Sequence, residues 1–275
     1  MNWNIHVIQR KQSNLEVANE LIKRITIHIH DGSTSNLINI IREAKPLAAI
    51  HLASLFIAQH TSNDIESLIQ SNLLFSTQLT EAMAVNDVKI LINAGTSWQN
   101  YENKDYSPVC LYAAMKQAYE AILQFYVETA KIKVITLKLF DTYGPGDWRP
   151  KLLKLLKDTV RSGAQLNMSP GGQLIDLVYI DDVVDAFIIA LERSQTETAN
   201  AMETFGVSSA NPIPLKDIID TYQDVSGTPI HVKWGARDYR PREVMHPWTN
   251  FNTLPGWTPK VRLRDGIYLC LKTSD

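Results

Sequence analysis

Apolar and polar positions follow two alternating patterns up to about residue 145. Short apolar runs predict strands, and the longer stretches between them carry apolar residues at helical spacing. The runs that predict strands are residues 3–8, 25–29, 47–53, 88–94 and 133–140. The stretches that predict helices are residues 15–23, 37–44, 62–85 and 109–130. Strands separated by helices indicate βαβ units, so we predict an α/β fold whose parallel sheet is covered on both faces.

The pattern loosens in the second half of the chain. Residues 150–163 and 215–225 predict helices, and residues 176–194 predict a short strand that leads into another helix. The stretch 240–259 is rich in proline and predicts turns. At 275 residues, the chain is long enough for one large domain or for two lobes that share it.

Composition narrows the class of protein. The chain is 45% apolar and 20% charged, which is typical of a globular protein with a sizeable core. Its net charge of −2 offers no basic field for nucleic acid or an anionic membrane. Since no apolar run approaches about 18 residues and the N-terminus lacks a signal-peptide pattern, we expect a cytoplasmic protein. Cys110 and Cys270 lack metal-type spacing, and we expect no metal site.

Glycine is scarce where dinucleotide-binding sheets need it. Such sheets normally open with a strand, a G-x-G-x-x-G turn and a helix, because glycine lets backbone N–H groups reach the pyrophosphate. Here Gly32 is the only glycine before Gly95, and the only G-x-G, at Gly144 and Gly146, follows a late strand. Two interpretations stay open: the fold does not bind a dinucleotide, or the chain begins one βα unit late.

Tyr112 and Lys116 are the candidate acid/base pair, because they lie one helical turn apart on the same face. A lysine ammonium at this spacing is expected to lower the pKa of the phenol toward working pH. Thr96 follows the strand at residues 88–94, and the carboxyl ends of parallel strands line the ligand crevice. Tyr268 and Lys272 repeat the spacing near the C-terminus without a strand-end partner, so we take them as the chance pair.

Eight stretches together give the sequence a specific resemblance. In order and spacing it resembles an extended short-chain dehydrogenase/reductase, the family of nucleotide-sugar epimerases, dehydratases and reductases. Within that family it is similar to the reductases that act on CDP-4-keto-deoxyhexoses. The stretches are AIHLAS (49–54), Asn72, NAGTS (93–97), YAAMK (112–116), LKLFDTYGPGD (137–147), DLVYIDDVVDAF (176–187), RPRE (240–243) and GWTPKVRLRDGI (256–267).

The resemblance implies a Rossmann-like doubly wound parallel sheet that lacks its first strand, glycine loop and helix. It also implies a small C-terminal lobe that binds the substrate. The Rossmann-like part would comprise residues 1–146 and 176–205, and the substrate lobe residues 147–175 and 206–275. Relatives often form homodimers through two long helices, here the stretches 62–85 and 109–130.

The resemblance also assigns roles to residues. Thr96 would polarise the sugar oxygen, Tyr112 would be the acid/base, and Lys116 would hold the nicotinamide ribose. Asp31, His51, Leu52 and Ala53 would line the adenosine and pyrophosphate path. Arg10 and Lys11 end the strand that reads the adenosine ribose; because basic residues accommodate a 2′-phosphate, NADP is favoured over NAD. The residues expected to bind a nucleotide-sugar substrate are Thr96, Ser97, Asp141, Arg149, Arg240 and Arg242.

Departures from the family pattern bear on the reaction. Asp141 stands where many relatives have Asn, and Ile175 where an Arg is common. Ser97 and Trp98 stand where 4,6-dehydratases have an Asp-Glu pair, so dehydration is disfavoured. We expect NADP(H)-dependent 4-keto reduction of a nucleotide-activated deoxysugar. The alternatives are a 4-epimerase, an inactive truncated fragment, and a nucleotide-sugar binder without redox turnover.

Overall fold

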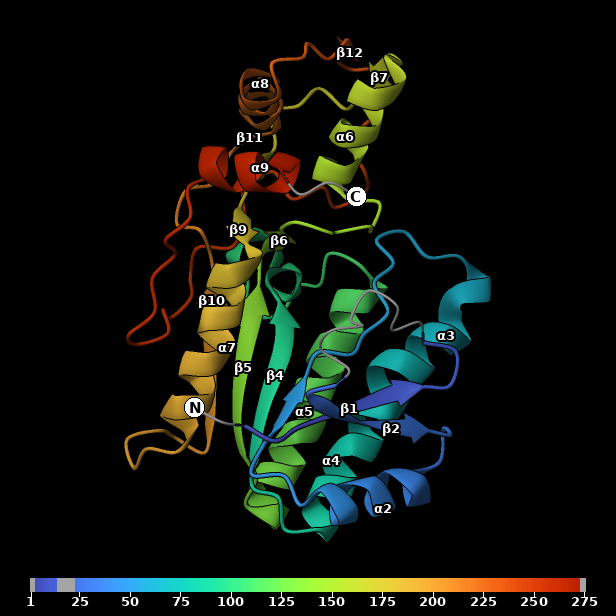
Figure 1. Ribbon diagram of the computed structural model, residues 1–275, viewed down its shortest axis with the longest axis vertical. Coiled ribbons are helices and arrows are strands. Elements are labelled where there is room, and N and C mark those ends of the chain that lie inside the picture. Colours follow the sequence, from blue (N-terminus) through green and yellow to red (C-terminus); the bar gives the residue numbers. More distant parts are fainter. Residues whose placement is uncertain (1–2, 14–22, 273–275) are drawn as a thin grey trace.

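Four parallel strands form the central sheet of the computed structural model, which describes residues 3–13 and 23–272 (Figure 1). In sheet order they are β10 (Met202–Val207), β5 (Lys133–Leu139), β4 (Ile90–Thr96) and β3 (Ala49–His51). Side chains alternate between faces along β4, so Leu91 belongs to one core cluster and Ile92 to another. The predicted α/β fold with a parallel sheet is confirmed.

Helices cover both faces of this sheet (Figure 1). One face packs against α2 (Thr34–Ala44), α4 (Phe75–Val85) and α5 (Leu111–Ala130). The other face packs against α7 (Ile180–Ser194). Burial of the sheet on both sides explains why its strands are continuous apolar runs rather than alternating ones.

Two further strands form a separate parallel pair. β1 (Ile5–Arg10) pairs with β2 (Ile25–His30), in the register Ile5 to Ile25. Among the described strands, neither of the two is hydrogen-bonded to β3. Both sheets carry exposed apolar side chains, including Ile29 and Ile50. The expected absence of a first βα unit stays a prediction, and the helix expected at residues 15–23 lies largely outside the described residues.

The long helix expected at residues 62–85 is divided. A 3-10 turn, η2 (Ser62–Asp64), is followed by α3 (Ile65–Ile69), a π-helical turn, η3 (Gln70–Leu74), and α4. Asn72 is buried in the π turn, and its amide both donates to Leu55 O and accepts from Leu55 N, at 3.0 Å each. The helical stretch expected at residues 62–85 is therefore confirmed in its bounds, with a π turn inserted within it.

The second half of the chain builds a smaller group of elements beyond the carboxyl ends of β4 and β5 (Figure 1). Its core contains Leu156, Ile219, Tyr222 and Ile267. Its helices and paired strands are α6 (Leu152–Ser162), α8 (Leu215–Ser226), α9 (Leu263–Lys272), β7 (Leu166–Asn167) with β12 (Val232–Lys233), and β8 (Leu174–Ile175) with β11 (Ile213–Pro214). A short parallel pair, β6 (Asp141–Tyr143) with β9 (Leu177–Tyr179), connects this group to the sheet. The boundaries expected from the sequence stay a prediction.

Within residues 3–13 and 23–272, the helices are all too short or too polar to span a bilayer.

Candidate active site

The carboxyl end of β4 and the start of α5 bring the candidate acid/base pair to the sheet. Lys116 is 3% exposed and its Nζ donates to Ala94 O at 2.9 Å. The same nitrogen lies 5.8 Å from the centroid of the Tyr112 ring. Because Ala94 belongs to the strand that ends in Thr96, the lysine is bonded to the strand that carries the candidate threonine. Sequence spacing alone correctly placed the pair on one helix.

Tyr112 is buried under a loop that follows β3. The edge of its ring meets Phe56 at a centroid distance of 5.2 Å, and Phe56 also contacts Trp98 at 5.4 Å. Burial raises the pKa of Tyr112 to about 12, and a hydrogen bond with Ser54 opposes that rise only in part. The expected lowering of this pKa is therefore wrong for the free chain: the lysine ammonium bonds to the strand, and loss of water dominates at the phenol. Tyr112 carries its proton at neutral pH.

Lys116 responds to the same burial in the opposite direction. Burial lowers the pKa of Lys116 to about 8, and the carboxylate of Glu120 opposes this effect. The amine is thus mostly an ammonium at neutral pH, within reach of losing its proton in mild alkali. A protonated phenol beside a cation is suited to donating a proton to an oxygen atom of a ligand.

Thr96 is the N-cap of a short 3-10 turn, η4 (Ser97–Gln99). Its hydroxyl accepts from Trp98 N at 3.3 Å, which leaves the O–H hydrogen available to a ligand. Ser97 is 8% exposed and lies next in the same turn. Capping and contact with a ligand are therefore compatible roles for Thr96.

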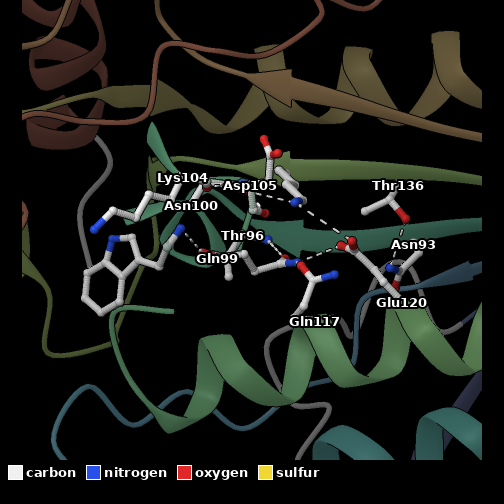
Figure 2. A network of polar contacts seen from close by, with 11 residues as sticks. Asn93, Thr96, Gln99, Asn100, Lys104, Asp105, Gln117, Glu120 and Thr136 are labelled. Carbon is white, nitrogen blue, oxygen red and sulfur yellow. Dashed lines mark hydrogen bonds and ion pairs between the residues drawn. The ribbon is translucent and has the colours of Figure 1, made fainter. Parts of the chain in front are cut away.

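A network of buried polar side chains underlies this strand end (Figure 2). Gln99 Oε1 accepts from Thr96 N at 3.0 Å, and Gln99 Nε2 donates to Glu120 Oε1 at 2.8 Å. Lys138 Nζ donates to Asn100 Oδ1 at 2.9 Å. The sequence pattern alone did not indicate this network. The sequence carries a sign of it, because Glu120 and Lys138 are charged residues within otherwise apolar helix and strand patterns.

A small cavity of about 90 Å³ opens beside Ser97. Asp141, Gln173 and Arg240 are among its lining residues. Gln173 is 7% exposed, and within the described chain its Oε1 has no hydrogen-bond partner. Burial raises the pKa of Asp141, although Lys151 and Arg240 act against it. The cavity thus offers polar groups that lack a full set of partners, next to the candidate threonine.

The three candidate arginines already hold partners within the chain. Arg149 makes a bidentate pair with Asp147, with Nε at 2.6 Å. Arg240 pairs with Glu243 and lies 5.6 Å above the ring of Trp98. Arg242 NH2 donates to Ser107 Oγ at 2.7 Å, and its guanidinium lies 4.4 Å from the Tyr101 ring centroid. Each arginine must exchange or share a partner to bind a phosphate, so their substrate role stays a prediction.

Comparison with known proteins identifies the family. A family model described as "NAD dependent epimerase/dehydratase family" matches residues 1–202, a range that contains Thr96, Tyr112 and Lys116. The chain belongs to this family. The resemblance to the extended short-chain dehydrogenase/reductases is thereby confirmed.

Curated relatives and solved structures add the following similarities. CDP-abequose synthase of Salmonella muenchen is 24% identical over 276 residues, which cover 99% of this chain and 90% of the relative. The synthase of the same name from Yersinia pseudotuberculosis is 27% identical over 208 residues, covering 74% and 71%. The structure of UDP-glucose 4-epimerase from Thermotoga maritima with UDP-glucose superposes with a TM-score of 0.86 at 19% identity, covering 98% of this chain and 90% of the other. This structural likeness confirms the Rossmann-like fold.

The family's nicotinamide cofactor can be compared with the residues at the strand ends. Arg10 and Lys11 are exposed at the end of β1, and the buried Oε1 of Gln9 has no hydrogen-bond partner among residues 3–13 and 23–272. Asp31 Oδ1 accepts from Ser33 N at 2.8 Å. Two exposed cations at this strand end suit a ligand that carries phosphate groups, as this cofactor does.

The residues after β3 contribute unequally to that region. His51 is 1% exposed and its Nε2 lies 2.7 Å from Ser76 Oγ, so its ring belongs to the core and only its backbone can meet a ligand. Leu52 is 60% exposed, and Ala53 is also exposed. The glycine turn that would hold a pyrophosphate has no counterpart near them in the sequence, where Gly32 is the one glycine before Gly95.

Histidines near the N-terminal strands do not gather as metal ligands. His28 Nε2 lies 2.9 Å from His6 Nδ1, and His30 Nδ1 lies 3.2 Å from Asn36 Oδ1. In the described part of the chain, no group of three or more His, Cys, Asp or Glu side chains could hold a metal ion.

Proposed function

We propose that the protein reduces the 4-keto group of a nucleotide-activated deoxysugar with NADP(H). The observation that carries this proposal is a buried, protonated Tyr112 beside Lys116, which is bonded to the strand that ends in Thr96. The CDP-abequose synthases among the relatives support a CDP-linked deoxysugar as substrate. Arg10 and Lys11 support NADP over NAD, because they offer cations to a 2′-phosphate.

Each residue has a definite task in this reaction. The nicotinamide cofactor, when bound, supplies the hydride that reaches C4 of the sugar. Tyr112 donates its phenolic proton to the C4 oxygen, so the ketone becomes an alcohol. Thr96 donates its O–H to the same oxygen, and the Lys116 ammonium stabilises the phenolate that remains. Ser97 and Trp98 provide no acid/base pair for dehydration.

Epimerisation at C4 is the second candidate reaction. Several solved structures of similar fold are named as UDP-sugar 4-epimerases, and some hold NAD. The same tyrosine and lysine serve both half-reactions of such an enzyme. A nucleotide-sugar binder without redox turnover is the third candidate, favoured by the scarcity of glycine in the first third of the sequence. A homodimer and a cytoplasmic location, expected from the sequence, stay predictions.

A turnover assay with matched tyrosine variants tests the proposal. The purified chain is incubated with a CDP-4-keto-6-deoxyhexose and NADPH, and nicotinamide absorbance and sugar product are followed. We expect Tyr112→Phe to lower kcat about 10²–10⁴-fold, because proton donation is lost while the ring shape is kept. Tyr268→Phe, in the C-terminal pair with the same spacing, leaves kcat unchanged.

Two other outcomes of this assay would favour the epimerase or the non-redox binder. Interconversion of UDP-sugars without net loss of NADPH supports the epimerase and overturns the reductase. A folded chain that binds a nucleotide sugar yet leaves NADPH unchanged with every 4-keto sugar offered is a binder.

A further inference from the structure

Three ionisable side chains lie in one row on the buried face of α5. Tyr112, Lys116 and Glu120 follow each other at one-turn spacing and are 9%, 3% and 7% exposed. The proposed function uses the first two and leaves Glu120 without a role. A charge taken out of water is costly unless it is paired or hydrogen-bonded, so the partners of Glu120 indicate why it is tolerated.

One carboxylate oxygen of Glu120 connects to the candidate threonine through Gln99 (Figure 2). Gln99 is fully buried, and its Oε1 accepts from Thr96 N at 3.0 Å. A backbone N–H can only donate, so this contact sets the orientation of the amide. Gln99 Nε2 must then face Glu120 Oε1 at 2.8 Å and Gln117 Oε1 at 2.9 Å. The carboxylate thus fixes the strand end through one intervening side chain.

The other oxygen of Glu120 faces a second buried lysine. Its Oε2 lies 3.8 Å from Lys138 Nζ, which also donates to Asn100 Oδ1. Asn100 Nδ2 in turn donates to Lys104 O and Asp105 O, so the network holds the loop after η4 as well. Gly95 leaves room for this arrangement, because a Cβ there would lie 3.1 Å from Gln99 Oε1 and 2.9 Å from Thr136 Cγ2.

The charges around Lys116 come from two elements. Glu120 and Tyr112 face it from α5, and His51 faces it from β3. Burial holds the pKa of His51 at about 3, so that ring is neutral in ordinary buffers. Of these facing groups, Glu120 alone carries negative charge. The Glu120 carboxylate also faces Lys138, and Asp105 faces Lys138 as well.

We propose that Glu120 is a positioning residue for the acid/base pair: its carboxylate fixes the Thr96 strand end through Gln99 and keeps Lys116 cationic. The role of Glu120 in catalysis rests on the proposed function, whereas its effect on the protonation of Lys116 does not. Burial raises the pKa of Glu120, and Lys138, Gln99 and Lys116 counteract it in that order. Contacts at both carboxylate oxygens, from Gln99 Nε2 and from Lys138 Nζ, oppose this effect of burial.

Two substitutions separate the two effects of Glu120. Glu120→Gln keeps the shape and an acceptor for Gln99 but removes the charge, so we expect Lys116 to titrate about 1 pH unit lower. Gln99→Leu breaks the contact with Thr96 N and also removes one of the three groups that oppose burial at Glu120. We expect this variant to lower kcat by up to about 10²-fold through misplacement of the strand end. The Lys116 midpoint should fall by less than in Glu120→Gln, because Lys138 and Lys116 still face the carboxylate.

The titration is read directly by NMR on the full chain with isotope-labelled lysine side chains, with the Lys116 signal assigned from Lys116→Met. Glu128→Gln is the matched control, because Glu128 is exposed on the same helix. The expected result is a lower Lys116 midpoint in Glu120→Gln and an unchanged one in Glu128→Gln. In a turnover assay, the alkaline limb of the pH profile shifts by the same amount.

An unchanged Lys116 midpoint in folded Glu120→Gln overturns the proposal. If that variant does not fold, Lys138→Met decides: removal of the competing cation raises the Lys116 midpoint, and no rise overturns the proposal. A lowered midpoint in a chain that turns over no nucleotide sugar keeps the electrostatic effect and removes the proposed function. Normal turnover of a nucleotide sugar by the wild type, with a Lys116 midpoint that does not move in Glu120→Gln, keeps the proposed function and removes the electrostatic effect.

Discussion

His51 shows most directly how burial sets protonation in this protein. Its ring packs against Phe75 and Tyr119 and bonds to Ser76. Burial, with a smaller effect of Lys116, lowers the pKa of His51 to about 3. The folded chain therefore holds a neutral imidazole where an unfolded chain takes up a proton at about pH 6.5.

The pH dependence of stability follows from that difference. Below about pH 6.5 the unfolded state binds a proton on this ring, whereas the folded state does not bind one until about pH 3. The unfolding free energy therefore decreases as the pH is lowered through this window. The loss due to His51 is about 1.4 kcal/mol per pH unit. Urea unfolding at several pH values checks this by comparing wild type with His51→Gln, which removes this part of the slope. His231→Gln, at an exposed histidine, is the control; equal slopes in wild type and His51→Gln contradict the account.

The candidate pair was accessible from sequence because its spacing is local. Tyr112 and Lys116 belong to one helix, and Thr96 follows an apolar strand directly. The protonation of Tyr112 was not accessible, because Phe56 and Ser54 that shield it come from a distant loop. Gln99 and Glu120 were missed for the same reason: they meet only when α5 packs on the sheet.

At the scale of elements, the π turn η3 controls the loop over Tyr112. Asn72 binds both the N–H and the C=O of Leu55, so the segment with Ser54 and Phe56 is held by one side chain. Asn72→Ala is expected to cost about 1–3 kcal/mol, because two partly buried backbone groups of Leu55 lose their partner. The loosened loop also admits water, so the pKa of Tyr112 falls from about 12 toward the ordinary value near 10.

Chemical unfolding and a phenolate absorbance titration check both effects. Asn63→Ala, at an exposed position in η2, should change neither. A pKa of Tyr112 that stays near 12 in folded Asn72→Ala would show that the loop is held by other contacts.

Helices and strands were predicted correctly where the spacing of apolar residues was regular. They were missed where contacts with distant segments determine the structure. The five strands expected in the first half are present within a few residues of their predicted bounds. β10 was missed because Glu203, Thr204 and Gly206 interrupt its apolar run, although it pairs along its length with β5. α9 was missed because Gly266 and Ile267 are its buried residues, too few for a clear period. The π turn was hidden because the apolar pattern continues through it.

Across the whole molecule, Asp182 joins the C-terminal segment to α7, which packs on the sheet. Its carboxylate accepts from Lys260 N and Val261 N at 3.0 Å each, and its backbone O accepts from Trp257 Nε1 at 2.8 Å. Trp257 and Leu254 complete the core on the α7 face. Asp182 is not the N-cap of α7, which is Tyr179.

Removal of that carboxylate should weaken the whole fold. Asp182→Ala leaves two backbone N–H groups without their charged acceptor, and we expect a loss of about 2–4 kcal/mol in unfolding free energy. Asp181→Ala removes the exposed neighbour at the same helix end and should cost less than about 1 kcal/mol. Urea denaturation of both variants measures the difference. Equal losses would show that the C-terminal segment is anchored elsewhere.

Every role proposed for Tyr112 and Lys116 depends on cofactor binding, so a binding titration decides whether this site can work as proposed. The purified chain is titrated with NADPH and with NADH, following nicotinamide fluorescence, and Lys116→Met is titrated in parallel. The account predicts saturable binding, tighter for NADPH, that weakens about tenfold or more when the buried ammonium is removed. No binding of either nucleotide by a chain shown to be folded would contradict the proposed function. Tyr112 and Lys116 would then be a buried pair that does not carry out this reaction.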